Sequence, residues 1–265
     1  MLEHTLFRRP QTTGLHLLQR RGDRGATELT SWRLALDAGG RQTYTSPDEE
    51  TVIVLQNGAG TFASGDRSWR VSRANVFEER ATALYLPPGR ELTVRAERPL
   101  EAVLVSTPAP SDDTQREPVL IAPADIEPAA RGRQLYSREV HNICVTDPHV
   151  RRLMVGETFN PAGHWSSFPP HKHDGKDGEP VLEEVYHFRI DPAQGFGQQM
   201  LYTADGENVT HAVRDGDAVL LRYGYHPVAA APGYRLYYLW AMAGAQRKLA
   251  LHEDPDHKWI HESQS

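Results

Sequence analysis

The stretch Ala218-Val219-Leu220-Leu221-Arg222-Tyr223-Gly224-Tyr225-His226 combines an apolar, strand-like run with a glycine turn and a histidine that follows it. Similar short runs, rich in β-branched and aromatic residues, recur along the chain, and 21 glycines and 19 prolines are scattered between them. They fall at residues 51–55, 83–86, 92–96, 102–105, 153–158, 184–188 and 236–240. This pattern is typical of all-β sandwiches and barrels, whereas long amphipathic helical patterns are hard to find. We therefore expect an all-β fold.

The composition is that of an ordinary globular protein of 265 residues with a small excess of acidic groups. Hydrophobic residues make up 39% and charged residues 24%, which excludes the disordered and coiled-coil classes. The formal net charge is −6 and no basic stripe is present, so nucleic acid is not an expected partner. The single cysteine, Cys144, excludes an intrachain disulfide framework and agrees with a reducing compartment. No run approaches the roughly 18 apolar residues of a membrane span, so we expect a cytoplasmic protein without a membrane partner.

The two halves of the sequence look like weak copies of each other. In each half an acidic residue opens an apolar strand, and a strand, a glycine turn and another strand follow. Glu50 then corresponds to Glu184, and Glu91 corresponds to His226 when the turn glycines are aligned. Eleven of the 13 histidines lie at or after His141, so we expect the chemistry in the second half. The expected domains are an N-terminal barrel without metal ligands over residues 1–112, a connection over 113–135, and a C-terminal barrel with the metal and active site over 136–265.

A cluster of metal-ligating side chains is predicted in the second half. His171 and His173 are two residues apart in an expected strand, so both point to the same face. Glu184 opens the next strand, and His226 follows the glycine turn. Three neutral imidazoles and one carboxylate suit Zn²⁺, Mn²⁺, Fe²⁺, Ni²⁺ or Co²⁺. Although an isolated His-x-His pair is common by chance, the carboxylate and the later histidine on β elements favour one bound divalent metal ion.

Glu183 competes with Glu184 for the role of carboxylate ligand. We prefer Glu184 because it shares strand parity with Tyr186, which is expected on the inner face of the barrel. Glu183 is then predicted to face away from the site, where it would be a solvated charge.

These residues resemble the two motifs of the cupins, and a longer series of motifs resembles a narrower family. Two features depart from the usual cupin pattern: ten residues separate His173 from Glu184, and Arg222 stands where the second motif usually has proline. The long gap is rich in Gly, Asp and Lys and predicts a loop inserted at the barrel mouth. The longer series is similar to the 5-deoxy-glucuronate isomerases of bacterial inositol catabolism. It includes Gly156-Glu157, residues 165–174, Glu183-Glu184-Val185-Tyr186, Gly195-Phe196-Gly197, Gly224-Tyr225-His226-Pro227, Ala231-Pro232-Gly233-Tyr234 and Met242-Ala243-Gly244.

The resemblance implies a bicupin, with two jelly-roll β-barrel domains in tandem. It implies an aldose–ketose isomerase that converts 5-deoxy-D-glucuronate to 5-dehydro-2-deoxy-D-gluconate. The family is related to the uronate isomerases of pectin breakdown, whose second barrel binds a metal through three histidines and one glutamate. Carried over, these ligands are His171, His173, Glu184 and His226, with Zn²⁺ as the first choice of metal. The expected partner is a small deoxy-uronate, and assembly into a homo-oligomer is left open.

The isomerisation needs a group that moves a proton between carbons and a cation that binds the substrate carboxylate. Glu157 is a candidate base because it interrupts an apolar strand, although a surface carboxylate on an edge strand would look the same. Tyr186 could donate a hydrogen bond to a substrate oxygen, or could simply be a core residue. We count Glu157 and Tyr186 as the predicted catalytic residues. The cations nearest in sequence are Lys172, Arg189 and Arg222, and for Lys172 and Arg222 strand parity favours a surface position.

Two other functions fit the same ligands. A cupin dioxygenase would use Fe²⁺ to activate O₂, and would differ from an isomerase in its metal and in oxygen consumption. A sugar-binding module without catalysis is the other alternative, but the intact set of four ligands and the lack of a DNA-binding motif disfavour it.

Overall fold

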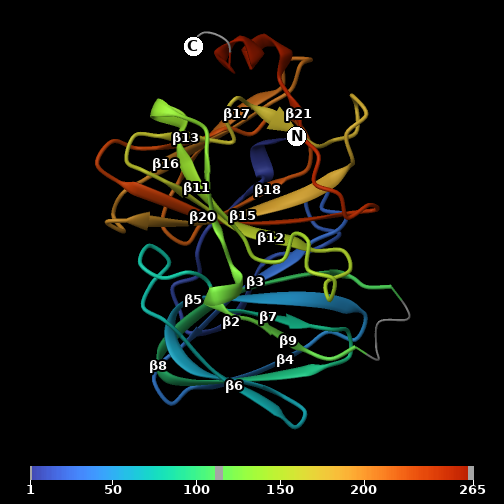
Figure 1. Cartoon of the computed structure of the whole chain (residues 1–265), viewed down its shortest axis with the longest axis vertical. Coiled ribbons are helices and arrows are strands. Elements are labelled where there is room, and N and C mark those ends of the chain that lie inside the picture. The colour runs from blue at the N-terminus through green and yellow to red at the C-terminus, as the bar shows by residue number, and fades with distance from the viewer. Residues whose placement is uncertain (1, 111–115, 262–265) are drawn as a thin grey trace.

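The computed structural model describes residues 2–110 and 116–261, and nearly all of its regular structure is antiparallel β-sheet. The chain forms two barrel-like halves, with the N-terminal half in blue to green and the C-terminal half in yellow to red (Figure 1). Four short 3₁₀ helices accompany the strands in the described residues: η1 (Leu2–His4), η3 (Pro123–Asp125), η4 (Gln134–Tyr136) and η5 (Pro255–His261). The prediction of an all-β fold is confirmed.

The first half is one eight-stranded antiparallel sheet. Its strands are β2 (Gly14–Gln19), β3 (Thr30–Leu36), β4 (Arg41–Thr45), β5 (Glu49–Ser64), β6 (Arg67–Arg73), β7 (Ala83–Leu86), β8 (Glu91–Pro108) and β9 (Val119–Ile121). The long strands β5 and β8 pair along most of their length, with irregular register near Gly58. At Gly58 the backbone has a φ of +99°, and a Cβ would lie 2.2 Å from the carbonyl oxygen of Pro99. Glycine therefore allows the two strands to bend together there.

The second half contains a seven-stranded sheet, a four-stranded sheet and a two-stranded ribbon. The larger sheet runs in the order β1 (Leu6–Phe7), β18 (Ala218–Leu221), β15 (Leu182–Asp191), β20 (Arg235–Gly244), β12 (Met154–Asn160), β11 (Arg138–Asn142) and β10 (Pro128–Arg131). The smaller sheet runs in the order β13 (Trp165–Ser166), β19 (Val228–Ala230), β16 (Gly197–Tyr202) and β17 (Asn208–Val213). The ribbon pairs β14 (His171–Lys172) with β21 (His252–Glu253).

Three apolar clusters stabilise this arrangement. One fills the first barrel, one fills the second, and the third lies between the halves. The central strands of the larger sheet are therefore buried on both faces. On β15, Tyr186 belongs to the core of the second barrel, whereas Val185 belongs to the cluster between the halves. This alternation decides which residues can reach a site inside the second barrel.

The strand register relates the two halves to each other. Thr51 on β5 pairs with Leu86, the last residue of β7. Glu184 on β15 pairs with Leu221, the last residue of β18. Thr51 in the first barrel is therefore equivalent to Glu184 in the second. Our alignment of Glu50 with Glu184 is wrong by one residue.

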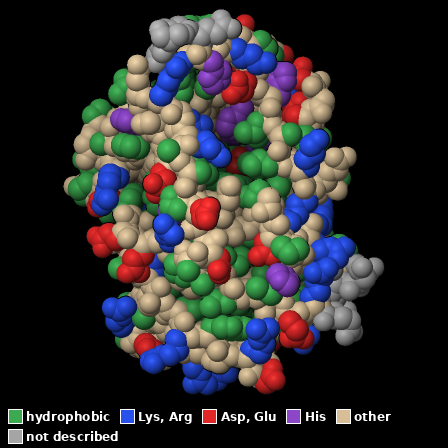
Figure 2. Space-filling model, in the orientation of Figure 1, with side chains coloured by type: hydrophobic (Ala, Val, Ile, Leu, Met, Phe, Trp, Pro, Cys, Tyr) green, Lys and Arg blue, Asp and Glu red, His purple; other side chains and the backbone are tan. Residues whose placement is uncertain are grey.

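The domain boundaries stay predictions. The boundary between residues 112 and 113 lies outside the described residues. Strand β1, from the start of the chain, pairs with β18 in the second half. Figure 1 accordingly draws the N-terminus within the C-terminal half. Most histidine side chains on the face drawn in Figure 2 lie over the C-terminal half. None of the helices in the described residues is long and apolar enough to cross a membrane.

Candidate functional site

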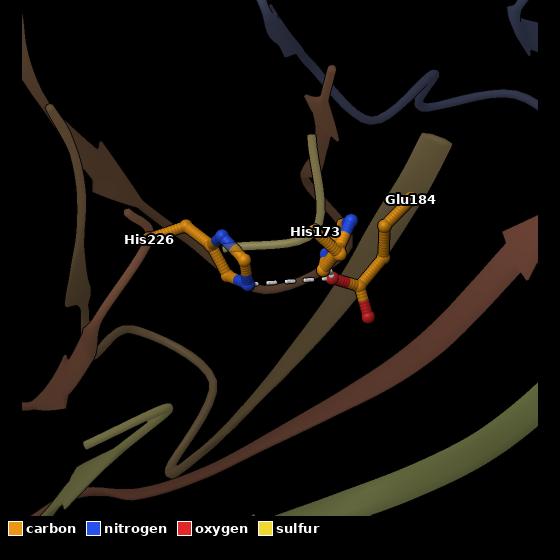
Figure 3. Close-up of side chains that lie close together, drawn as sticks. All are labelled: His173, Glu184 and His226. Carbon is orange, nitrogen blue, oxygen red and sulfur yellow. Dashed lines mark hydrogen bonds and ion pairs between the residues drawn. The ribbon is translucent and has the colours of Figure 1, made fainter. Parts of the chain in front are cut away.

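His173, Glu184 and His226 form a buried cluster inside the second barrel (Figure 3). Their potential ligand atoms all lie within 4.8 Å of one another. Oε2 of Glu184 is 3.1 Å from Nε2 of His173 and 3.5 Å from Nε2 of His226. The three side chains are at most 3% exposed. They come from three separate segments of the chain, so the fold assembles the cluster.

Local backbone geometry positions each member of the cluster. Glu184 lies on the inner face of β15, with Tyr186 two residues further along. His226 follows a turn at Gly224, where φ is +84° and a Cβ would lie 2.6 Å from the carbonyl oxygen of Tyr202. Only glycine fits this turn without strain, so Gly224 fixes the direction in which His226 enters the barrel.

Backbone carbonyls orient both imidazoles. Nδ1 of His173 donates to the carbonyl oxygen of Leu182 at 2.6 Å, and Nδ1 of His226 donates to the carbonyl oxygen of Gly224 at 3.0 Å. Because a carbonyl can only accept, these bonds place a proton on each Nδ1 and leave both Nε2 atoms directed toward Glu184. Carbonyl partners on the outer nitrogen are typical of metal-binding histidines.

The electrostatics of the cluster fit a divalent cation. Burial, together with the other histidines, holds the pKa of His226 well below its usual value, so its imidazole is neutral. Burial raises the pKa of Glu184. Burial alone would lower the pKa of His173, but the hydrogen bond and charge of the Glu184 carboxylate raise it above its usual value. Oε1 of Glu184 and Nε2 of His226 are buried without a hydrogen-bond partner. Buried oxygen and nitrogen atoms that carry a free lone pair are expected where a metal ion binds.

His171 lies beside the cluster but outside the group of three. Its ring centroid is 4.8 Å from that of His226, and it lines the adjacent pocket. Burial, His173 and Arg138 lower the pKa of His171 to about 3, so it is also neutral. The structure thus brings three of the four predicted ligands together, and the role of His171 as the fourth stays a prediction.

A pocket of about 250 Å³ opens beside the cluster. Its polar lining includes Arg131, Arg138, Ser167, His171, Glu184 and Tyr186. Its apolar lining includes Trp240, Met242, Leu249 and Leu251. The volume is close to the lower end of the range for small-molecule sites. The two arginines were missed as site residues because β10 and β11 lack a clear apolar alternation from which their inner face could be predicted.

Tyr186 lies in this pocket, as predicted. Its hydroxyl is 3.1 Å from Oγ of Ser167, and its ring stacks on Tyr238 with centroids 4.3 Å apart. Burial, followed by the charge of Glu184, raises the pKa of Tyr186 well above 10, so the phenol keeps its proton. It can therefore donate a hydrogen bond into the pocket.

Glu157 lies on the opposite face of the sheet, which corrects our prediction that it is a catalytic base. Because Val155, Glu157 and Phe159 alternate along β12, they share one face of the sheet, and this face points toward the first barrel. Arg73 donates to both of its oxygens at 2.7 and 3.0 Å, and the hydroxyl of Tyr237 donates to one of them at 2.7 Å. The carboxylate is completely buried and joins the two halves. Sequence parity could not distinguish the two faces because both are buried.

The cations nearest in sequence are engaged elsewhere. The ammonium of buried Lys172 pairs with Asp174, Asp177 and Glu179 at 2.6 to 2.8 Å and so holds the inserted loop, which corrects the expectation of a surface charge. Arg189 pairs with Glu101 and Asp215 between the halves. The guanidinium of Arg222 lies over the ring of Tyr223 at 5.1 Å.

Glu183 faces away from the cluster, as predicted, but it is buried and not solvated. Its carboxylate accepts hydrogen bonds from the backbone N–H groups of Thr27, Glu28 and Leu29 at 2.6, 3.2 and 2.8 Å. It therefore binds a loop of the first half to the second barrel.

Comparison with known proteins identifies the family. The model of the KduI/IolB family matches residues 7–260. The chain belongs to this family. A 5-deoxy-glucuronate isomerase of Geobacillus kaustophilus (strain HTA426) is 38% identical over 222 residues, which cover 82% of this chain and 79% of the relative.

Solved structures agree with this membership of the KduI/IolB family. An IolB-like protein of Salmonella typhimurium LT2 matches with a TM-score of 0.91 and 33% identity, over 97% of this chain and 99% of that protein. A mutant of the oxalate decarboxylase of Bacillus subtilis matches with a TM-score of 0.65 and 14% identity, over 96% of this chain and 80% of that one. The second match shows the fold alone, and together they confirm the cupin-type architecture.

Proposed function

We propose that this chain is a 5-deoxy-glucuronate isomerase, which converts 5-deoxy-D-glucuronate to 5-dehydro-2-deoxy-D-gluconate in inositol catabolism. The observation that supports this most is the buried cluster of His173, Glu184 and His226 beside a pocket with two arginines, in a chain 38% identical to a 5-deoxy-glucuronate isomerase. An aldose–ketose isomerisation needs a site that stabilises negative charge on sugar oxygens. A uronate substrate also needs a group that binds its carboxylate. The alternatives of a dioxygenase and of a non-catalytic binding module are not favoured.

We further propose that His173, Glu184 and His226 hold one divalent metal ion, with His171 as a fourth ligand and Zn²⁺ as the first candidate. When bound, such an ion would act as a Lewis acid toward the substrate oxygens, an effect worth several kcal/mol. The neutral imidazoles of His171 and His226 and the unpartnered donor atoms support this assignment.

The side chains of the pocket provide the rest of the chemistry in this proposal. Tyr186, whose raised pKa keeps it protonated, donates a hydrogen bond to a substrate oxygen and so stabilises charge that develops there. Trp240, Met242 and the exposed side chains of Leu249 and Leu251 form an apolar wall that limits water in the pocket. With Glu157 on the other face of the sheet, Tyr186 remains the predicted catalytic residue. A cytoplasmic location is carried forward as part of the proposal, and assembly into a homo-oligomer stays open.

The proposal is tested with purified protein, 5-deoxy-D-glucuronate and NMR. We expect the aldehyde signal of the substrate to disappear as the ketone product forms, and we expect a chelator to stop the reaction and added metal to restore it. Protein that holds metal but does not convert this substrate would overturn the proposed activity.

A further inference from the structure

A uronate carries a carboxylate that the site must bind, and the cations predicted from the sequence are not available for it. Lys172, Arg189 and Arg222 all lie outside the pocket lining. The pocket instead contains two arginines from neighbouring strands, Arg131 at the end of β10 and Arg138 at the start of β11.

Arg131 and Arg138 are placed directly opposite each other in the antiparallel pairing of β10 and β11. Like charges at such positions repel, because the side chains are only about 5 Å apart at Cβ. Within the two described ranges, neither arginine forms an ion pair with a carboxylate, and the hydrogen bonds of Arg138 go to backbone carbonyls. This pocket therefore holds two positive charges that no carboxylate of the described chain pairs with.

The guanidinium of Arg138 is held in place from one side only. Its Nη1 donates to the carbonyl oxygens of Tyr136 and Phe168 at 3.1 and 3.2 Å. A Cβ at Gly132, where φ is +69°, would lie 2.6 Å from this Nη1 and 2.2 Å from the carbonyl oxygen of Tyr136. The glycine thus makes room for the guanidinium. No described residue accepts a hydrogen bond from its Nε or Nη2, so these donors are free to bind a ligand.

We propose that Arg138, with Arg131 beside it, binds the carboxylate of the sugar acid in the pocket next to His171 and Glu184. This rests on the proposed function, and it assigns recognition of the acid group to β10 and β11, away from the strands that carry the metal cluster. Planar guanidinium groups bind carboxylates through paired hydrogen bonds, which lysine cannot reproduce. Burial, together with the charge of Arg131, lowers the pKa of Arg138, as expected for a cation that lacks a counter-charge.

The test compares binding of D-glucuronate and D-glucose to the metal-loaded protein by calorimetry, because this readout does not depend on turnover. Wild-type protein should prefer D-glucuronate. Arg138→Gln should reduce this preference about 10- to 100-fold, the range for a charge-assisted hydrogen bond, and Arg138→Lys should restore only part of it. Arg131→Gln, a change at an exposed strand end that the fold tolerates, should reduce the preference by a smaller factor.

The first barrel offers a matched control. Arg41 and Arg95 also lie opposite each other in a strand pair, but both are exposed. Arg95→Gln should leave the preference for D-glucuronate unchanged.

The possible failures are distinguishable. An unchanged preference in both Arg138→Gln and Arg131→Gln, or no preference in the wild type, would overturn the carboxylate subsite. A wild type that prefers D-glucuronate but leaves 5-deoxy-D-glucuronate unconverted would overturn the proposed activity and keep the subsite.

Discussion

The two barrels share a strand register but differ in what fills them. In the first barrel, Thr51 occupies the position of Glu184, and its hydroxyl lies 3.1 Å from that of Tyr44. The surrounding core is aliphatic and aromatic. In the second barrel the same position carries a carboxylate that faces two histidines. Among residues 2–110, no three metal-ligating side chains come together.

This difference shows that both barrels provide the same backbone position, and that the side chain at this position determines whether the interior is an apolar core or a polar site. In the first barrel, the buried hydroxyls of Tyr44 and Thr51 lie within hydrogen-bond distance of each other. The second barrel leaves Oε1 of Glu184 and Nε2 of His226 without hydrogen-bond partners, an arrangement that lowers stability unless a ligand satisfies them.

The halves are alike in how they bind each other. Glu50 accepts hydrogen bonds from three consecutive backbone N–H groups of the second half, at Arg151, Arg152 and Leu153. Glu183 does the same with residues 27–29 of the first half. Each barrel therefore contributes one buried carboxylate to a reciprocal pair of contacts.

Removing a ligand from the second barrel should have the largest effect. We expect His226→Ala to lose its bound metal and at least about 10³-fold in kcat/KM, because the charge-stabilising group is no longer held. Metal content is measured by elemental analysis and activity by the NMR assay.

Glu91→Ala, the change at the equivalent position of the first barrel, is the control for His226→Ala. It should retain full metal and activity. Metal loss from the Glu91 variant, or full metal in the His226 variant, would contradict the difference between the barrels.

The ion pair of Arg73 and Glu157 tests the contact between the barrels. Arg73→Met should lower the free energy of unfolding by about 3–5 kcal/mol, because it leaves the completely buried Glu157 without its partner. The double variant Arg73→Met/Glu157→Leu should recover most of this loss in urea unfolding.

Glu157→Gln should retain the kcat of the folded enzyme, because Glu157 lies on the face of the sheet away from the pocket. A fall in kcat of about 100-fold, within the range for loss of a general base, would restore Glu157 as a catalytic candidate.

The fold was easier to predict from the sequence than the site. Short apolar runs predicted the strands, and the spacing of His173, Glu184 and His226 predicted the cluster, because strand parity and a glycine turn are local features. Glu157 was misassigned because its strand is buried on both faces, and only the tertiary structure shows which face contains the pocket. Arg138 lies on a short strand with weak alternation, so nothing in the sequence assigned it to the barrel interior.

The carboxylates of Glu50 and Glu183 should contribute equally to the free energy of unfolding. We expect Glu50→Gln and Glu183→Gln each to lower the free energy of unfolding by about 2–3 kcal/mol, because one amide replaces a carboxylate that accepts several backbone hydrogen bonds. Activity per folded molecule should change little, since neither side chain lines the pocket. A loss in one variant that exceeds the other by several kcal/mol would show that the contacts are not equivalent.

Acid should weaken the contact between the halves by a smaller amount. Although burial opposes it, Arg189, Arg33 and Arg9 lower the pKa of Glu101 below its usual value of 4.5. A depressed pKa in the folded state means that the stabilisation is complete above about pH 4.5 and is lost as the pH falls through the folded value. Glu101→Gln should cost about 1–2 kcal/mol at neutral pH and flatten the decline between about pH 5 and 3. An unaltered pH profile in thermal unfolding would contradict this assignment.

Anomalous diffraction from crystals of the zinc-loaded protein tests the central claim most directly. We predict one strong peak per chain, in the second barrel between His173, Glu184 and His226, and no peak in the interior of the first barrel. A peak in the first barrel, or an ion bound elsewhere while this cluster stays empty, would contradict the account.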